Sequence, residues 1–313
     1  MEVLDYSIIA CYFAIILWIA RWASKGKEDK EFSSVDYFLA GKDQSWVVIG
    51  ASLFASNIGS EIILGVSGAG ARANMPMANF EILAALVLIL FGWVFVPFYM
   101  RTGVYTMPEF LEKRYSQACR NYLSIVSILA YIITKISLII FAGELVFEVL
   151  NIPFWTGAII TVVATWLYTV SDGLKAVIYT DMFQAFVLLV GTTVVTILGL
   201  HQIGGWDELI NTLSIALQSG TNPPLDRFFN LWRPMSDTQY TWTGMLFGAP
   251  IFGIWYTDQY IVQQALSAKD ISNARKGALF AGYLMLLPVF IFFLPGVVAY
   301  ALLQKRGHCF FNG

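Results

Sequence analysis

Long apolar runs separated by shorter polar stretches recur along the whole chain. Each run is close to the roughly 20 residues that an α-helix needs to cross the hydrocarbon core of a bilayer. The pattern predicts eight membrane-spanning helices, at about residues 4–23, 46–71, 80–100, 121–148, 153–170, 176–200, 243–264 and 277–304. It therefore predicts one all-α polytopic membrane domain over residues 1–304, followed by an atypical tail at residues 305–313.

Two of these segments carry residues that favour a break in the helix. One contains SNIGS at residues 56–60, and the other contains GMLFGAPIFGIWYTDQY at residues 244–260. Irregular backbone at membrane depth is tolerated only where protein buries it or where it lines a wet cavity. In transporters such breaks mark the central site, because the freed carbonyls can ligate a cation. Small residues can also serve close helix packing alone, and SNIGS by itself fits either interpretation. Two broken segments favour a site.

The composition agrees with a membrane protein and argues against several other classes. The chain is 58% hydrophobic and 13% charged, against roughly a quarter charged in soluble domains, and its mean hydropathy is +0.66. The net charge of −2, without a basic tract, gives no support for a nucleic-acid partner. Three cysteines and two histidines lack the spacing of a metal site. No catalytic constellation is visible, so we do not expect an enzyme.

Basic residues outside the predicted helices indicate the orientation. The loops after the first, third, fifth and seventh helices carry 13 Lys and Arg, and the remaining loops carry 5. Because cytoplasmic loops are enriched in positive charge, this asymmetry predicts an external N-terminus. The opening residues, MEVLDYSIIACYF, have no basic region and no small-residue cleavage site, so we expect a retained first helix.

Ionisable side chains within the predicted helices cost roughly 2.5–3.5 kcal/mol each on the insertion scale, so they usually face the protein interior or a partner. We expect Lys135 to pair with a carboxylate on another helix. Glu81 opens the third helix and fits an interfacial acid stabilised by the positive helix end. Asp181 fits either an N-cap-like acid, the favoured interpretation, or part of a cation path. The full set is Glu61, Glu81, Lys135, Glu144, Glu148, Asp181 and Asp258.

Five longer motifs, in this order and with compatible spacing, resemble the sodium/solute symporter family, and most closely its sodium–glucose and inositol cotransporter branch. They are GASLFASNIGSE, GWVFVPFYMRTGVYTMPEFLEKRY, YIITKIS, GLKAVIYTDMFQ and WYTDQYIVQQALSAK. The resemblance covers about residues 5–304 and implies a fold like that of the leucine transporter. In that fold ten core helices form two inverted repeats, and each repeat begins with a broken helix.

The resemblance also implies residues that bind sodium and solute. The backbone carbonyls of Ala55 and Ile58 match sodium ligands, which makes sodium the implied coupling ion. Asn57 and Glu81 match polar residues that hydrogen-bond the hydroxyl groups of a sugar. The implied solute is therefore a small polar molecule.

Several positions resemble or depart from the gate and pocket of sugar-carrying relatives. Trp255 matches an aromatic residue beside the inner gate, and Ile254 replaces the gating tyrosine. Asp181 matches an acid associated with the sodium exit route. Ile62 and Met285 stand where relatives place hydrogen-bonding side chains. A pocket built to hydrogen-bond hydroxyl groups selects its solute because the wrong solute leaves the polar groups of the pocket unpaired. With two of those groups replaced by apolar side chains, we expect weak transport of glucose.

The function implied is sodium-coupled symport of a small polar, sugar- or polyol-like solute across the plasma membrane. A non-transporting sensor of sodium or solute is the alternative, and an inactive fragment is another. The fragment interpretation rests on a count of eight helices and a missing C-terminal part. It predicts that Asn57 and Asp258 are poorly satisfied, because the helices that they should contact are missing. The predicted partners are the solute and membrane lipid, and the sequence indicates no protein partner.

Overall fold

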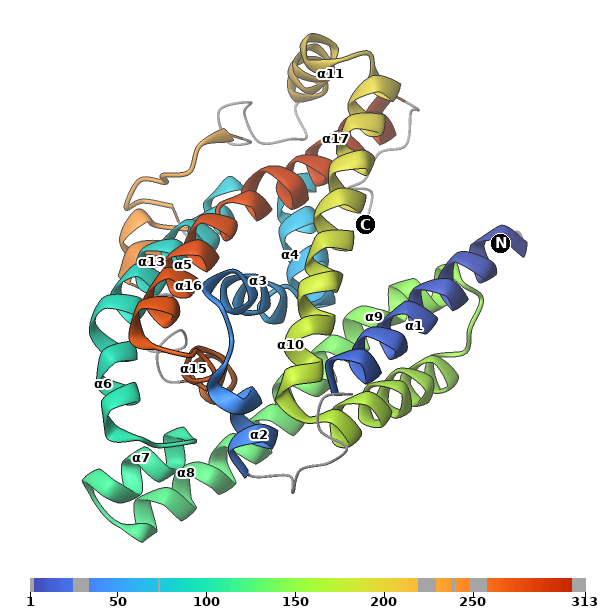
Figure 1. Ribbon diagram of the computed structural model, residues 1–313. Helices are drawn as coiled ribbons and strands as arrows, with labels where there is room; N and C mark the ends of the chain where they lie inside the picture. The colour runs from blue at the N-terminus through green and yellow to red at the C-terminus, as the bar shows by residue number, and fades with distance from the viewer. Residues whose placement is uncertain are drawn as a thin grey trace. The chain divides into compact units, whose positions relative to one another are not determined.

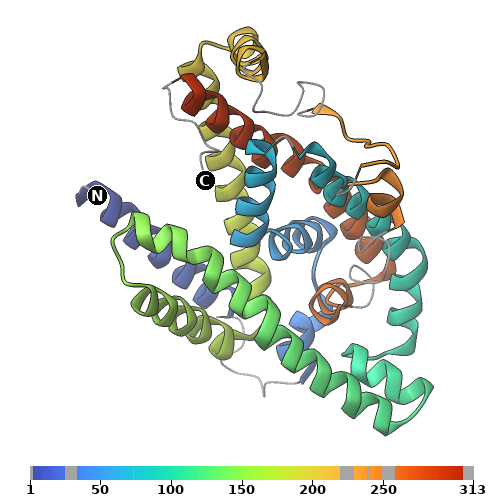
Figure 2. The ribbon, with the colours of Figure 1, turned by 180° about the vertical axis from the view of Figure 1, so that it is seen from behind.

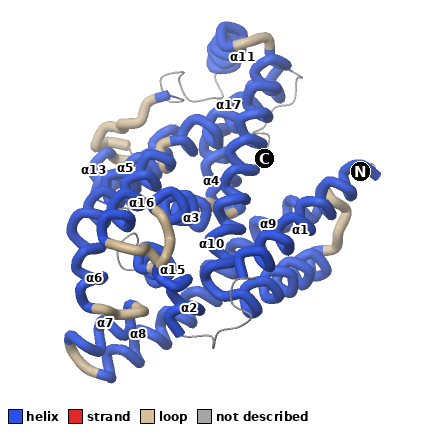
Figure 3. Tube along the Cα trace, viewed as in Figure 1, coloured by secondary structure: helices blue, strands red, loops and turns tan. Residues whose placement is uncertain are grey.

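The structure is a computed structural model that describes residues 3–24, 34–72, 74–218, 229–237, 240–247 and 258–305. Within these residues every regular element is a helix (Figure 3). The chain divides into two compact units. The first consists of Met1–Glu61, Ile89–Ala185 and Tyr256–Ala281, and the second of Ile62–Leu88, Phe186–Trp255 and Gly282–Gly313.

Five helical stretches are long and apolar enough to cross a membrane. They are Tyr6–Ala23, Met75–Thr102, Gln117–Val149, Gly173–Ile203 and Ile271–Lys305. Three shorter apolar helices, Trp46–Ser56, Ile62–Ala71 and Phe154–Leu167, fall within two more of the predicted segments. The remaining predicted segment, 243–264, lies partly outside the described residues, and the GAPIFG part of its predicted break lies there entirely.

Most helices of the chain can be followed from blue to red in Figure 1. The first unit contains α1 (Val3–Ser24), α2 (Ser34–Leu39), η2 (Ala40–Lys42), α3 (Trp46–Ser56), η4 (Phe91–Phe95), α6 (Val96–Thr102), α7 (Met107–Arg114), α8 (Gln117–Ala130), η5 (Tyr131–Ile136), α9 (Ser137–Val149), α15 (Gln259–Leu266) and most of α16 (Ile271–Leu284). The second contains most of α4 (Ser60–Ala71), η3 (Met75–Ala78), most of α5 (Asn79–Leu90), α11 (Trp206–Gln218), α13 (Trp242–Phe247), η6 (Val289–Phe293) and α17 (Leu294–Lys305). The long α10 (Phe154–Ile203) contributes to both units.

The predicted break at SNIGS is confirmed. The helix α3 ends at Ser56 and α4 begins at Ser60, with Asn57, Ile58 and Gly59 between them. The short helix in the stretch TMPEFLEKRY begins at a capping threonine. Thr106 is the N-cap of α7, and its side chain accepts a hydrogen bond from the backbone N–H of Glu109.

The long α10 bends sharply at Gly173. This residue has a φ of 67° and a ψ of −166°, which lie outside the helical region. A Cβ atom at this position would lie 3.0 Å from both the ring and the carbonyl oxygen of Tyr37, so glycine permits the bend and the close approach. The bend separates the parts of α10 that correspond to the fifth and sixth predicted segments.

In the first unit, α15 packs against α2, α3 and α6. Its apolar side chains Ile261 and Val262 are buried, as are Leu53 and Phe54 of α3. The helices α3 (blue) and α15 (orange) lie close to each other in both views (Figures 1 and 2). Packing on these apolar faces positions the polar ends of the two helices beside each other.

Candidate functional site

Asn57, the predicted solute ligand, follows α3 and makes hydrogen bonds through its backbone and through both ends of its side-chain amide. Its backbone N–H donates to the carbonyl of Phe54 at 3.2 Å, and its Nδ2 donates to the carbonyl of Leu53 at 2.7 Å. Its Oδ1 accepts a hydrogen bond from the Tyr260 hydroxyl at 2.7 Å. Asn57 therefore ends the helix with one side of its amide and contacts α15 with the other.

The two predicted sodium-ligating carbonyls flank Asn57. Ala55 lies in the last turn of α3, and its carbonyl accepts a hydrogen bond from the backbone N–H of Ile58 at 3.0 Å. Carbonyls in a last helical turn lack the regular helical donor, and each carbonyl oxygen has a second lone pair. Ile58 itself lies outside regular helix. The backbone here has the acceptor chemistry that a hard cation prefers.

Asp181 lies well inside α10, beyond the bend at Gly173, so its interpretation as an N-cap-like acid is wrong. Its Oδ2 instead accepts hydrogen bonds from two hydroxyls of α3, from Ser56 at 2.8 Å and from Ser52 at 3.4 Å. Sequence inspection missed both serines as its partners, because a local pattern does not show which distant helix faces an acid. The contact ties the sixth predicted segment to the end of α3.

Gln264 extends this cluster from α15. Its Nε2 donates to the Ser56 hydroxyl at 2.6 Å, and Gln264 is almost fully buried, with 3% of its surface exposed. Its Oε1 is buried and has no hydrogen-bond partner among the described residues. Ser52, Ser56, Asp181 and Gln264, called here the Asp181 cluster, thus combine a carboxylate, two hydroxyls and an unpaired amide oxygen.

A second polar group surrounds Asp258, which precedes α15. Its Oδ2 pairs with the Lys135 ammonium at 3.1 Å, and its Oδ1 accepts a hydrogen bond from the Tyr131 hydroxyl. The prediction that Lys135 meets a carboxylate on another element is therefore confirmed. The Lys135 ammonium also lies 3.6 Å from the centre of the Tyr260 ring. We name Tyr131, Lys135, Asp258 and Tyr260 the Lys135 cluster.

These contacts correct one expectation of the fragment interpretation. Asn57 and Asp258 were expected to be poorly satisfied, but each has at least two hydrogen-bonding or ionic partners. The partners come from α3, α15 and η5. For Asp258 the signal that could have found them is the pair Tyr131 and Lys135, four residues apart and so on one face of a helix.

The second unit contains the other predicted pocket residues. Glu81 lies in the first turn of α5, as expected, and is 6% exposed. It has no hydrogen-bond or ion-pair partner among the residues that the structure describes. Met285 is fully buried in the turn after α16, and Ile62 is half-buried in α4. Ile254 and Trp255 lie outside the described residues, and so does the side chain of Glu61.

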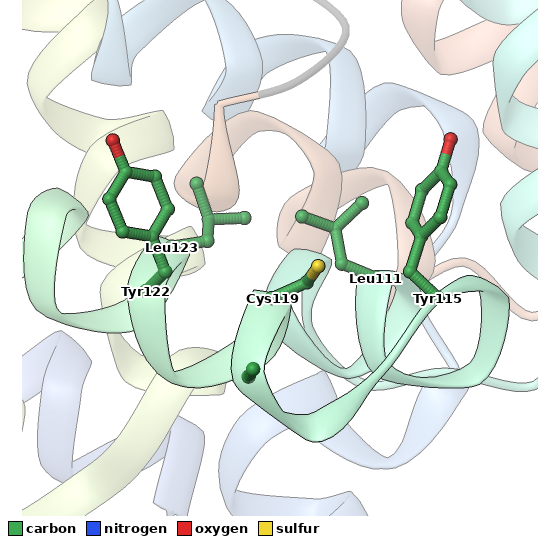
Figure 4. A pocket seen from close by; sticks show the side chains of 6 residues that line it. Leu111, Tyr115, Cys119, Tyr122 and Leu123 are labelled. Atoms are coloured by element: carbon green, nitrogen blue, oxygen red, sulfur yellow. The ribbon is translucent and has the colours of Figure 1, made fainter.

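A groove on α7 and α8 differs from these polar clusters (Figure 4). It is lined by Leu111, Tyr115, Ala118, Cys119, Tyr122 and Leu123. The lining is apolar and aromatic apart from one thiol and two tyrosine hydroxyls, and it includes no carboxylate side chain. It therefore lacks the negatively charged oxygen that the Asp181 cluster offers to a cation.

Comparison with known proteins agrees with the motifs. The chain matches the Sodium:solute symporter family over residues 37–311. The sodium/glucose cotransporter 1 of Ovis aries is 37% identical over 320 residues, which cover 97% of this chain and 48% of that protein. The sodium/myo-inositol cotransporter of Canis lupus familiaris is 39% identical, with 96% of this chain and 44% of that protein covered. The sodium/mannose cotransporter of Bos taurus is 39% identical, with 99% and 53% covered.

A solved structure supports the fold. It is the substrate-bound, outward-open state of a sodium-coupled sialic acid symporter, with a TM-score of 0.83 and 20% sequence identity over 98% of this chain and 62% of that one. The predicted all-α, leucine-transporter-like fold is confirmed by this likeness. The chain spans about half the length of the curated relatives that it matches. By its motifs and by these matches, the chain belongs to the sodium:solute symporter family.

Proposed function

We propose that the protein carries out sodium-coupled symport of a small polar organic solute of the sugar or polyol class. The observation that carries the proposal is the break between α3 and α4, where Asn57 and the Ala55 and Ile58 carbonyls adjoin Ser56, a member of the Asp181 cluster, in the chain. Family membership and relatives named for glucose, mannose and myo-inositol support it. Such a transporter is a secondary transporter and not an enzyme.

Sodium would use the oxygen atoms at the end of α3. Sodium is a hard cation and prefers carbonyl, hydroxyl and carboxylate oxygens to nitrogen or sulfur. The carbonyls of Ala55 and Ile58 supply neutral oxygens, and Asp181 supplies the compensating negative charge beside Ser56. We assign the two carbonyls to sodium binding and Asp181 to the sodium route.

We assign Asn57, in the first unit, and Glu81, in the second, to solute binding, each from the resemblance. An amide both donates and accepts hydrogen bonds, and a carboxylate accepts from hydroxyl groups, so each suits a polyhydroxylated solute. Ile62 and Met285 offer no such groups. Because a pocket discriminates through hydrogen bonds that the wrong solute leaves unmade, we expect glucose to be a poor substrate. Trp255 and Ile254 are assigned to the inner gate by the same resemblance.

The test is uptake by cells that express the gene encoding this chain. Labelled myo-inositol, mannose and glucose are offered in sodium medium and in choline medium. We expect sodium-dependent uptake of a polyol or sugar, weak uptake of glucose, and loss of uptake in Asn57→Ala. Solute binding that depends on sodium but gives no uptake would favour the sensor alternative. Absence of both binding and uptake for the whole panel would refute the proposal.

We further propose that the protein resides in the plasma membrane with its N-terminus outside and lipid around its apolar helices. The charge asymmetry of the loops supports this orientation. Single cysteines at Ser236 and Ser272 are exposed positions for an impermeant thiol reagent applied to intact cells. We expect labelling at residue 236 and not at residue 272, and the reverse pattern would overturn the orientation.

A further inference from the structure

One face of α15 contacts the end of α3 through two polar side chains. Tyr260 and Gln264 lie one turn apart, and they donate to the last residue of α3 and the residue after it. Tyr260 donates to Asn57 Oδ1 at 2.7 Å, and Gln264 donates to Ser56 Oγ at 2.6 Å. The Gln264 contact belongs to the Asp181 cluster assigned to sodium. The Tyr260 contact reaches the residue assigned to the solute.

The ring of Tyr260 is positioned from a second direction. The Lys135 ammonium lies 3.6 Å from the ring centre, where the negative face of an aromatic ring attracts a cation. Lys135 is itself fixed by its ion pair with Asp258 at 3.1 Å, and Asp258 accepts a further hydrogen bond from Tyr131. Asp258 is the N-cap residue of α15 but makes no capping hydrogen bond with its side chain. Its carboxylate is used for the Lys135 cluster instead.

This arrangement places a hydroxyl donor where a solute hydroxyl would bind. The phenol of Tyr260 and an alcohol of a sugar or polyol offer the same O–H donor to an amide oxygen. The other end of the amide, Nδ2, is already bonded to the Leu53 carbonyl. The amide oxygen keeps a second lone pair and Nδ2 a second N–H, but a solute hydroxyl that donates to Oδ1 from the side of Tyr260 must exchange with the tyrosine hydroxyl.

We propose that Tyr260 is a positioning residue that occupies the solute-binding amide of Asn57 in the solute-free protein and releases it when a solute hydroxyl binds. The inference rests on the proposed function, because it needs Asn57 to contact solute. Tyr260 lowers the apparent affinity for solute, since its own hydrogen bond must be given up. The Lys135 cluster sets how readily the ring departs.

Tyr260→Phe tests whether Tyr260 and the solute compete for Asn57, because competition predicts tighter solute binding in the variant and a structural role predicts weaker binding. The variant keeps the ring over Lys135 and removes only the hydroxyl. Because an intramolecular hydrogen bond contributes modestly, we expect the dissociation constant for myo-inositol, measured on purified protein in sodium by isothermal titration calorimetry, to fall about two- to tenfold. In an Asn57→Ala background the same change brings no gain. Tyr283→Phe, at an exposed tyrosine of α16, is the matched control and leaves binding unchanged.

Hydrogen exchange provides a measurement that does not depend on solute. Loss of the Tyr260 contact should speed amide exchange at residues 57–59 by about two- to tenfold. Unchanged exchange in Tyr260→Phe overturns the inference. Weaker myo-inositol binding in Tyr260→Phe also overturns it, because a merely structural role predicts that sign. If the parent protein binds and transports no sugar or polyol, the proposed function fails, and the inference fails with it. If the parent protein binds solute normally but Tyr260→Phe shows unchanged exchange or weaker binding, only the inference about Tyr260 is wrong and the proposed function stands.

Discussion

The two halves of the broken segment, α3 and α4, hold their neighbours by different means. The end of α3 does so with side chains, through Ser52, Ser56 and Asn57. The part of α4 that lies in the other unit makes one such contact, from Ser67 Oγ to the Phe292 carbonyl at 2.9 Å, and otherwise packs through close backbone approaches. A Cβ atom on Gly70 would overlap the Phe293 carbonyl, and one on Gly296 would overlap the Ser67 carbonyl. The small residues of one continuous stretch therefore serve two purposes.

This difference locates the candidate site more narrowly than composition can. Glycine at α4 permits two backbones to approach, which is a packing role that needs no ligand. The polar side chains at the end of α3 lie beside a break in the helix, where carbonyls and amides are available to other partners. Under the proposed function, residues 52–58 are the part of this stretch that supplies ligands, and the glycines that follow serve helix packing.

Gly296→Val should have the largest effect, because it disrupts the close backbone packing of α17 against α4. A side chain at this position cannot fit beside the Ser67 carbonyl without moving α17 away from α4. We expect a loss of roughly 1–3 kcal/mol or more, seen as a lower melting temperature or as loss of folded protein in size-exclusion chromatography.

The matched control is Gly65→Ala on α4 itself. A Cβ atom there has nothing within 4 Å, and alanine favours a helix over glycine. It should leave the melting temperature unchanged or slightly higher. If Gly296→Val and the parent protein have the same melting temperature, the close approach of Gly296 to the Ser67 carbonyl is not important for stability.

Lys135→Met should have the next largest effect, because it disrupts the Lys135 cluster, whose Tyr260 contacts the end of α3. It leaves Asp258, whose side chain is 11% exposed, without its cation, and it removes the cation from the Tyr260 ring. Because Lys135 itself is 41% exposed, we expect a moderate cost of about 1–2 kcal/mol in thermal unfolding. Lys113→Met breaks a surface pair with Glu109 and should cost less than about 0.5 kcal/mol. Similar losses in the two variants would contradict a structural role for the Lys135 cluster.

The position of the helix break could be predicted from the sequence, but the residues that contact the end of α3 could not. The run Ser-Asn-Ile-Gly-Ser by itself fits either a break or close packing, the second Gly- and Pro-rich segment favours a break, and the break lies at this run. The contact of Asp181 with Ser56 joins residues that are 125 positions apart, which no local pattern encodes. Asp181 therefore resembled a helix cap in sequence and is a partner of serines in the structure.

The same limit explains the error at Asn57 and Asp258. The resemblance implies a larger bundle, so it places their partners on helices outside these 313 residues. The structure provides Tyr260 and Lys135 from within these residues. Charge pairing was predictable for Lys135, because an ammonium within a predicted membrane-spanning helix usually pairs with a carboxylate. Which carboxylate it meets depends on the packing of α15, and the sequence does not specify that.

Asp181→Asn tests whether the Asp181 cluster serves sodium. The amide can still accept the hydrogen bonds of Ser52 and Ser56, so stability should change little, while the negative charge is lost. A hydrogen bond or ionic contact to a charged group contributes about 1.5–3 kcal/mol, so the sodium concentration for half-maximal solute binding should rise about tenfold or more. An unchanged sodium dependence would assign Asp181 to structure alone.

Glu81→Gln should have the smallest effect and compares the second unit with the first. Glu81 is buried but, unlike Asp181, has no partner among the described residues, so its removal breaks no observed contact. If Glu81 bonds a solute hydroxyl, the change weakens one charge-assisted hydrogen bond to a neutral one. Solute binding should then fall about three- to tenfold, with the sodium dependence and the amount of folded protein unchanged. Glu81 also lies in the first turn of α5, where a negative charge stabilises the helix. A lower melting temperature with unchanged solute affinity would assign Glu81 to that capping role and remove it from the site.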